Sequence, residues 1–434
     1  MIKKTLLLLF TFLATVAMAQ EKKLTLHLND GTTQDFLVST IDSITFSEVQ
    51  QSGPALVLEY TVNDGDEIRL PLDGRLDCTV DYGDGTTDEF HENFSASSSD
   101  YKAHVYEKAG TYEVRIAGGV EHLYSGLGHT NDSRLLLTAI KSWGNLEGLT
   151  SMESAFRSCK GLLSVPADNN GAFKNVTSFK QAFEYCTKLK EIPSSLFAGC
   201  QAATTLYGCF ANCESLTALP DTLFYPLVNV TDFSSVMNWC SALKTLPEGL
   251  FAKNTNAENF GNAFCFSGLE SIPAKLFSGL RNAKDFNCVF QACRKLTAIP
   301  DSLFAGCTSA TNFSTAFWGN WNVTTIGKDV FQGCVAAANF KWLFNGCEKL
   351  ESVPANIFDD CKEVTNFSGT FKDCKALACE SPYTMVDDTK VHIYERQNYK
   401  WDFTKPTTFN ECFANATLLT DYNTISTDYS DWTK

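Results

Sequence analysis

The sequence predicts an α+β protein in which a long solenoid of about 27-residue coils follows a small all-β sandwich. Three observations support this fold class. Prolines recur at a nearly constant interval after residue 135, and hydrophobic residues alternate with polar ones over residues 54–120. The 434-residue chain is also 44% hydrophobic and 20% charged, which is typical of folded proteins. Its length allows several domains.

Residues 1–19 have the pattern of a secretory signal peptide. Lys3 and Lys4 precede an apolar run, and a small-residue cleavage pattern ends at Ala19. The run is shorter than the ~20 apolar residues that a membrane-spanning helix requires. The first cysteine is Cys78, which disfavours a lipid-anchored lipoprotein. We therefore expect an exported chain without a transmembrane span, at the cell surface, secreted or periplasmic.

Residues 20–53 predict a short β leader followed by a linker. Alternating leucines precede an Asn-Asp-Gly turn sequence, and a second alternating run follows it. The segment IDSITF (41–46) resembles a recurrent leader segment of Bacteroidetes surface proteins.

Residues 54–125 alternate at period two between turn residues, which predicts an antiparallel sandwich. The segments VDYGDGT (80–86) and HVYEKAGTYEV (104–114) resemble the paired signatures of PKD domains, an immunoglobulin-like fold of extracellular proteins. Tyr82 stands where that family more usually has tryptophan. The nearby aspartates, Asp81 among them, are either calcium-binding oxygens or, as we prefer, solvated turn formers.

A repeat dominates the chain from about residue 135. Each unit follows the pattern P-x-x-[LIV]-F-x-x-C-x-x-[AV]-x-x-F-x-x-x-F-x-x-C-x-x-L-x-x-[IVL]-P, with Gly327 replacing one proline. The two halves of the unit resemble each other, so we expect two extended pieces and two short helical turns in each coil. Such units stack on their neighbours into a solenoid. The prolines that mark the period are Pro166, Pro193, Pro220, Pro247, Pro273, Pro300 and Pro354.

The recurrent blocks F-x-x-C-x-x-L-x-x-[IVL]-P and V-T-N-F-x-x-x-F-x-x-C resemble those of BspA-type leucine-rich repeat surface proteins of Bacteroidetes. The resemblance implies a leucine-rich-repeat solenoid over residues 135–379, after the PKD-like sandwich, and a role as an adhesin or host-interaction protein. The 27-residue period is longer than the shorter BspA unit. Residues 380–434 break the period, and TFNECFANATLL (408–419) predicts a C-terminal capping coil.

The cysteines recur at two equivalent positions of the repeat, which indicates buried packing residues with free thiols. The alternative is a disulfide framework, for which the off-pattern Cys209, Cys288 and Cys379 are the better candidates. The structural repeat cysteines are Cys159, Cys186, Cys200, Cys213, Cys240, Cys293, Cys307, Cys334, Cys347, Cys361 and Cys374.

The sequence predicts no catalytic residues, no metal site and no cofactor. Residues 130–391 contain no histidine, so the repeat cysteines have no histidine base beside them in sequence. Acidic pairs such as Asp359-Asp360 are interpreted as solvated loop charge. The net charge of −15 disfavours nucleic acid as a partner.

Five aromatic residues occupy polar positions of the repeat, and we expect them to form an exposed stripe that binds a partner, or else to shield the coil edges. They are Tyr185, Trp239, Trp318, Trp321 and Trp342. We therefore predict an exported, non-enzymatic binding or adhesion protein for host or extracellular-matrix protein. The alternatives are a glycan-binding surface protein that uses these aromatics and a purely structural envelope protein. The oligomeric state stays open.

Overall fold

The computed structural model describes residues 23–27, 33–37, 54–96, 100–125, 133–398 and 402–434. The predicted signal peptide lies outside these residues. The chain divides into two units, Met1–Gln51 and Ser52–Lys434. In the first unit, β1 (Lys23–His27) pairs antiparallel with β2 (Thr33–Leu37).

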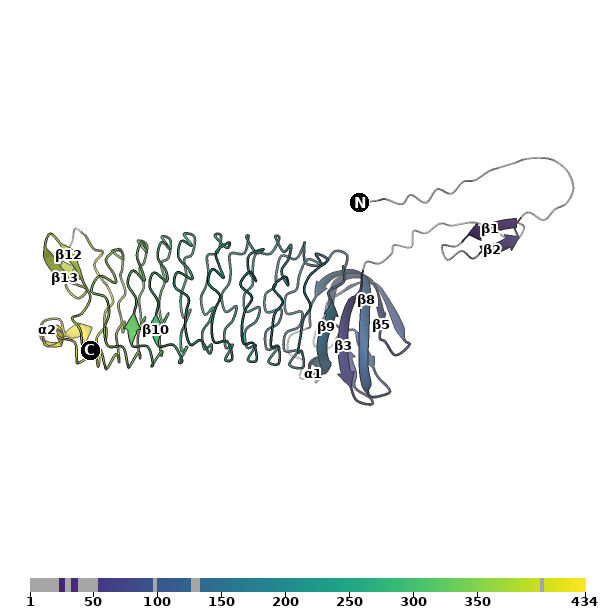
Figure 1. Ribbon diagram of the computed structural model, residues 1–434, viewed down its shortest axis with the longest axis horizontal. Helices are drawn as coiled ribbons and strands as arrows, with labels where there is room; N and C mark the ends of the chain where they lie inside the picture. The colour runs from purple at the N-terminus through teal and green to yellow at the C-terminus, as the bar shows by residue number, and fades with distance from the viewer. Residues whose placement is uncertain (1–22, 28–32, 38–53, 97–99, 126–132, 399–401) are drawn as a thin grey trace, which may run out of the picture. The chain divides into compact units, whose positions relative to one another are not determined.

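The second unit begins with antiparallel strands in a five-stranded sheet of order β6-β5-β8-β3-β9 (Figure 1). Its strands are β3 (Leu56–Val62), β5 (Leu72–Asp81), β6 (Thr87–Phe94), β8 (Gly110–Leu123) and β9 (Leu137–Ser142). A separate pair consists of β4 (Glu67–Arg69) and β7 (Ala103–Val105). Alternate residues of β5, such as Leu76, Cys78 and Val80, are buried, as the period-two pattern predicts. The PKD-like character of this region stays a prediction.

The VDYGDGT segment forms a tight turn between β5 and β6. Gly83 has a φ of 77°, and a Cβ there would lie 2.8 Å from the carbonyl oxygen of Glu113, so only glycine fits. Asp81 accepts a hydrogen bond from the Gly83 amide, and Asp84 accepts one from Thr86. The turn aspartates therefore have local partners, which favours the turn-former interpretation over calcium binding.

The sheet and the solenoid share one backbone ladder. Strand β9 pairs antiparallel with β3, and its Ala139 forms a parallel bridge with Ser164 of the next coil. The C-terminal half of β8 bridges in parallel with the first coil, at His122 and Ser151. The helix α1 (Ser133–Leu136) leads into β9. The predicted ranges 54–125 and 135–379 are thus joined by hydrogen-bonded strands of one unit.

Successive coils then stack in register, as Figure 1 shows between β9 and the C-terminal hairpin. A chain of parallel bridges links equivalent residues from Ser151 through Ser178 and Thr205 to Asn366 and Thr408. On another part of the coil, the short strands β10 (Ala298–Ile299) and β11 (Thr325–Ile326) also pair in parallel. Each coil therefore supplies the hydrogen-bonding edge on which the next one builds.

The expected helical turns are consecutive β-turns instead. In one coil the amide of Ala182 donates to the carbonyl of Phe179, and Cys186 donates to Phe183, each three residues back. Gln181 and Tyr185 have φ values of 54° and 62°, as at the third position of type II turns. Every second amide of this segment, which we call the turn segment, donates to a carbonyl of the adjacent coil. The bonds between residues four apart that define an α-helix are therefore not formed. Within the described residues 137–395, no segment is an α-helix.

Three columns of phenylalanine fill the core. Members of one column stack face to face across coils, as in Phe183 and Phe210, whose centroids lie 5.4 Å apart, while rings of neighbouring columns meet edge to face. The pattern F-x-x-x-F places two columns on one coil segment, and the F after the proline supplies the third. Their rings are almost completely buried.

The C-terminal residues close the column. The backbone amide of Phe371 donates a hydrogen bond to the carbonyl of Cys412, so residues 408–416 add a further coil. Trp432 covers this coil, stacking on Phe409 with centroids 4.7 Å apart. The remaining elements are β12 (Tyr383–Val386), β13 (Thr389–His392), η2 (Arg396–Asn398), α2 (Tyr422–Asp428) and η3 (Ser430–Trp432).

Candidate binding surface

The five predicted aromatics all lie on the turn segment of the coils and are exposed, but they fall into two patches. Tyr185 and Trp239 share one position of the repeat, two coils apart. Trp318, Trp321 and Trp342 belong to a second group nearer the C-terminus and occupy three different positions. The single continuous stripe expected from the sequence is therefore divided.

The first patch surrounds a groove of about 530 Å³, which we call the aromatic groove. Its floor is the coil that carries Gly208, Ala211 and Asn212, where neighbouring coils have larger side chains. The sequence predicted two of its aromatic residues, Tyr185 and Trp239, but neither Tyr207 nor the groove itself. The groove is lined by Glu184, Tyr185, Tyr207, Gly208, Ala211, Asn212, Glu214, Ser235, Asn238 and Trp239.

One face of the Trp239 indole packs against its own chain. The ring stacks on Phe266 of the next coil, with centroids 4.2 Å apart and planes 11° from parallel. The side chain is still 47% exposed, and it lines the aromatic groove. Trp239 thus combines a structural contact with a free aromatic surface.

Two tryptophans of the second patch already have a cationic partner. The Arg294 guanidinium lies 4.4 Å from the ring centroid of Trp321, and the Lys341 ammonium lies 4.6 Å from that of Trp342. Trp342 also lies against Gly369 of the following coil, where a Cβ would meet its ring. These side chains partly shield coil edges, which was the alternative interpretation of the aromatics.

A second row of side chains runs along the coils at a position occupied mostly by threonine. The hydroxyl of Thr204 donates to the carbonyl of Thr177, and Thr231 donates to Thr204, one coil back in each case. Glu258 and Lys284 interrupt the row and pair with each other at 2.7 Å. In this row, which we call the threonine face, the hydroxyls are held by carbonyls of the preceding coil.

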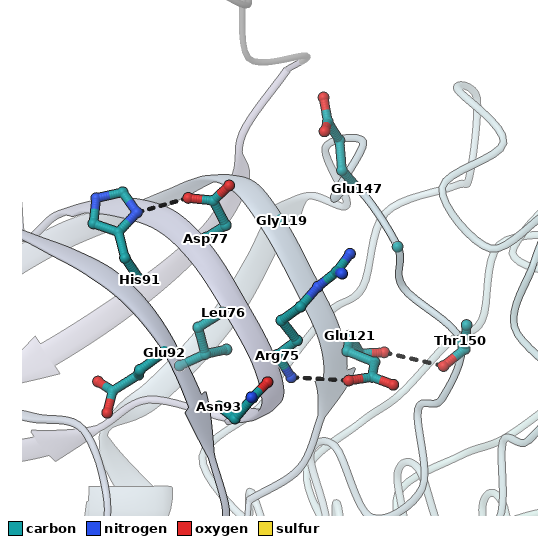
Figure 2. Close-up of a pocket in the computed structure, with 11 residues that line it drawn as sticks. Arg75, Leu76, Asp77, His91, Glu92, Asn93, Gly119, Glu121, Glu147 and Thr150 are labelled. Carbon is teal, nitrogen blue, oxygen red and sulfur yellow. Dashed lines mark hydrogen bonds and ion pairs between the residues drawn. The ribbon is translucent and has the colours of Figure 1, made fainter.

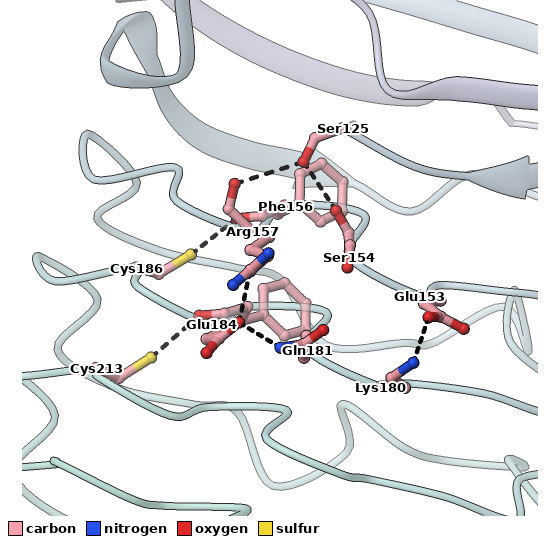
Figure 3. A network of polar contacts seen from close by, with 11 residues as sticks. Ser125, Glu153, Ser154, Phe156, Arg157, Lys180, Gln181, Glu184, Cys186 and Cys213 are labelled. Atoms are coloured by element: carbon pink, nitrogen blue, oxygen red, sulfur yellow. Dashed lines mark hydrogen bonds and ion pairs between the residues drawn. The ribbon is translucent and has the colours of Figure 1, made fainter. Parts of the chain in front are cut away.

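The repeat cysteines bond backbone carbonyls of the preceding coil (Figure 3). The thiol of Cys186 donates to Phe156 at 3.2 Å, and that of Cys213 donates to Phe183 at 3.3 Å. Asn320 occupies a cysteine position and donates to Phe290 in the same way. The same bond, at 3.1–3.5 Å, is made by Cys240, Cys293, Cys307, Cys334, Cys347 and Cys374.

All 17 cysteines of the chain lie in its described part, and all are free thiols, including Cys209, Cys288 and Cys379. Burial raises the pKa of Cys240 and Cys347 to about 12. Because the thiolate is the nucleophilic form, these side chains are unreactive near neutral pH.

Ion pairs connect the first coils around the same network. In Figure 3, Arg157 donates to Glu184 at 2.5 Å, and Glu184 also accepts from Gln181 at 2.8 Å. Lys180 pairs with Glu153 of the preceding coil at 2.8 Å. The Glu184 carboxylate at the rim of the aromatic groove is therefore already neutralised by its own chain.

A polar cleft of about 960 Å³ lies where the sheet meets the first coil (Figure 2). His91 and Asp77 pair at 2.6 Å on one side, and this hydrogen bond raises the pKa of His91. Glu121 accepts from the backbone amide of Arg75 at 2.9 Å on the other side. Carboxylates outnumber the one guanidinium of the lining, so the cleft does not favour an anionic ligand.

Near the C-terminus the fold assembles a serine, a histidine and a carboxylate that sequence spacing did not reveal. The hydroxyl of Ser381 lies 3.0 Å from Nδ1 of His392 and donates to Asp421 at 2.5 Å. Ser381 is fully buried, and its proton is directed to the carboxylate instead of the ring. Without access for a substrate, this cluster works as a hydrogen-bonded support for the C-terminal segment.

A family model described as "BspA type Leucine rich repeat region" matches the chain in six copies, over residues 169–311 and 217–378. The repeat region is a leucine-rich-repeat solenoid. Among curated proteins, none matches this chain. Within the described residues, no helix has the length and apolar character to cross a membrane.

The leucine-rich-repeat solenoid resembles several solved structures. A chain of the Toll - Spatzle complex from Drosophila is 19% identical over 55% of this chain, with a TM-score of 0.36. The match covers 30% of that chain. A leucine rich cell surface protein from Faecalibacterium prausnitzii A2-165 is 18% identical, with 56% of this chain and 78% of that chain covered and a TM-score of 0.20. The Leucine Rich Repeat protein of T. pallidum is 17% identical, with 51% and 82% covered and a TM-score of 0.16.

Proposed function

We propose that this chain is an exported, non-enzymatic binding protein whose solenoid contacts a protein partner, of the host or of the extracellular matrix. The observation that carries the proposal is the position of the exposed aromatics. Tyr185, Trp239 and Trp342 have φ values of 62°, 60° and 56°. Left-handed backbone is costly for bulky side chains. Glycine or asparagine occupies equivalent positions, Gly346 and Asn212 for Tyr185 and Trp239, and Gly208 and Asn262 for Trp342.

Exposed aromatics that the core does not need, at positions where they strain the backbone, are typical of a surface used for contact. The threonine face supports the same function. It extends over several coils, which suits the large contact area of a protein partner better than a small molecule. The family match supports the proposal, because leucine-rich repeats are typically found in non-enzymatic binding proteins. The signal-like residues 1–19 support export.

The test is a binding screen of the purified chain against matrix and serum proteins on one array and neutral and acidic glycans on another. We expect saturable binding to at least one protein and no saturable binding to glycans. Binding only to glycans would contradict the proposal and favour the glycan alternative. No saturable binding on either array would favour a purely structural role.

A double variant that replaces Trp239 and Trp342 with asparagine links any binding to the surface. Asparagine tolerates the left-handed backbone, so the coil should keep its conformation. Lost binding with an unchanged melting temperature supports the proposal. Trp143→Phe, in the buried core, is the matched control for loss of an indole, and it should bind normally if it folds.

A further inference from the structure

The aromatic groove carries an uncompensated negative charge. The Glu214 side chain is exposed at the groove, and equivalent positions on the adjacent coils are Thr187 and Ser241. The groove lining contains no lysine or arginine. Within the described residues, Glu214 has no ion pair, whereas Glu184 across the groove is held by Arg157.

The groove also has an unsatisfied hydrogen-bond acceptor. In the described part of the chain, Oδ1 of Asn238 is buried without a hydrogen-bond partner. Buried acceptors without a donor are uncommon and costly in folded proteins. This oxygen is covered by its own chain, as are Oδ1 of Asn254 and Asn320, so the exposed Glu214 carboxylate is the acceptor that favours a ligand with hydrogen-bond donors.

Elsewhere in the chain, exposed tryptophans have a basic side chain over the ring. On the same turn segment, Arg294 lies over Trp321 and Lys341 lies over Trp342. Among the described residues, no basic side chain lies over Trp239. Tyr185 and Trp239 are two coils apart, which is about 10 Å along the ladder. A flat group centred between the two rings would lie about 5 Å from each, within the ~6 Å reach of a cation–π contact.

We propose that the aromatic groove receives an arginine side chain of the protein partner. The guanidinium is planar, stacks on the faces of Trp239 and Tyr185, and pairs with the Glu214 carboxylate. The inference rests on the proposed function, because it names the chemistry of the partner that the solenoid binds.

Charge decides between arginine and a neutral saccharide, which also stacks on aromatic rings. A saccharide would cover the Glu214 carboxylate without supplying a positive charge, and covering an unpaired charge is costly. The net charge of −15 further attracts a basic partner and repels an acidic one. Arginine is favoured over lysine because its flat group can contact both rings.

The experiment titrates the full chain with the capped tripeptide acetyl-Gly-Arg-Gly-amide and follows tryptophan fluorescence at low and at physiological salt. The same peptide with citrulline keeps the planar shape and loses the charge. We expect the citrulline peptide to bind about tenfold more weakly than the arginine peptide, and salt to weaken only the arginine peptide. Equal binding of both peptides, or no binding of either, would overturn the inference.

Three variants locate the site. We expect E214Q and Trp239→Leu each to weaken binding of the arginine peptide about fivefold, the effect of one exposed ion pair or cation–π contact. Glu248→Gln removes an exposed carboxylate outside the groove and should bind as the parent does. Binding that survives both groove substitutions contradicts the inference, as does tighter binding of maltotriose than of the arginine peptide.

The two proposals fail in different ways. If a protein partner is found and binds E214Q and Trp239→Leu as tightly as the parent, the proposed function stands and the arginine site does not. If the screen finds no protein partner while the arginine peptide binds in the groove, the site stands and its assignment to a protein partner fails.

Discussion

The single residue that best explains the repeat is the cysteine beside the phenylalanine columns. Its regular spacing predicts a buried packing position, because a small apolar side chain fits there. What the spacing alone does not predict is the hydrogen bond that most of these thiols donate to a carbonyl of the preceding coil. Asn320 and Asn254 at cysteine positions make the same bond more strongly, since an amide N–H is a better donor than a thiol.

The equivalence of Asn320 and the repeat cysteines gives a test of their hydrogen-bonding role. Asn320→Ala removes the side-chain amide donor from the carbonyls of Phe290 and Phe317, which keep longer bonds from Cys293 at 3.4 Å and from Cys347 at 3.5 Å. We expect it to lower the free energy of unfolding by about 1–3 kcal/mol. Asn320→Cys restores a donor toward Phe290 and should recover part of this loss. Urea unfolding of the parent and the two variants measures the order of their unfolding free energies. Equal destabilisation by alanine and cysteine would show that the hydrogen bond to the carbonyl makes no contribution.

The raised thiol pKa values predict instability at alkaline pH. Burial raises the pKa of Cys240 from 9.0 to about 12, so above pH 9 the unfolded chain loses a proton that the folded chain keeps. The stabilisation from this thiol is therefore complete below pH 9 and is lost as the pH rises toward 12, by about 1.4 kcal/mol per pH unit. Cys240→Ser keeps a donor and does not titrate.

We thus expect the unfolding free energy of Cys240→Ser to fall less steeply than that of the parent between pH 9 and 10.5. Parallel slopes would mean that this thiol does not contribute. Melting temperatures in a pH series provide the measurement, and the comparison at pH 7 separates the titration from the packing cost of serine.

At the scale of the element, the sequence predicts the coil length and its phenylalanine columns but not the backbone of the turn segment. A helical turn and consecutive β-turns both bring residues three apart to one side, so the apolar pattern fits either. The difference lies in left-handed residues such as Gln181 and Tyr185, whose side chains give no sequence signal for that conformation. The aromatic groove was missed for a related reason. It depends on Gly208 and Ala211 being smaller than their neighbours, which only a comparison of equivalent positions reveals.

The junction between sheet and solenoid offers a matched pair of glycines. Gly144 and Gly148 have φ values of 66° and 77°, so alanine is strained at both. A Cβ at Gly144 would lie 2.3 Å from the amide nitrogen of Leu56 in β3, whereas nothing lies within 4 Å at Gly148. We expect Gly148→Ala to cost about 1 kcal/mol and Gly144→Ala about 2 kcal/mol or more beyond that.

Urea unfolding of the two variants measures this difference. Because the Gly144 clash is with backbone, no side-chain rotation relieves it, and β9 must move away from β3. Equal costs for the two alanines would contradict the close backbone approach at the junction.

At the scale of the whole molecule, each end of the second unit is closed by its own chain. The sheet supplies the edge on which the first coil builds, and Trp432 covers the last coil. Solenoids without such ends expose core rings and unpaired edges, which favour association. The stability of this unit is therefore carried by contacts between neighbouring coils and by two terminal coverings.

Trp432→Ala tests this arrangement. The indole stacks on Phe409 and also contacts Phe413 and Phe367, so its loss exposes rings of two coils, at a cost of about 3–5 kcal/mol. Because coils contact only their neighbours, we expect faster hydrogen exchange of the amides in residues 408–416 and unchanged exchange in residues 205–290. Trp342→Ala, at an exposed position, should leave exchange in residues 408–416 as in the parent. An equal increase along the whole chain after Trp432→Ala would instead mean that sheet, coils and C-terminal segment unfold as one cooperative body.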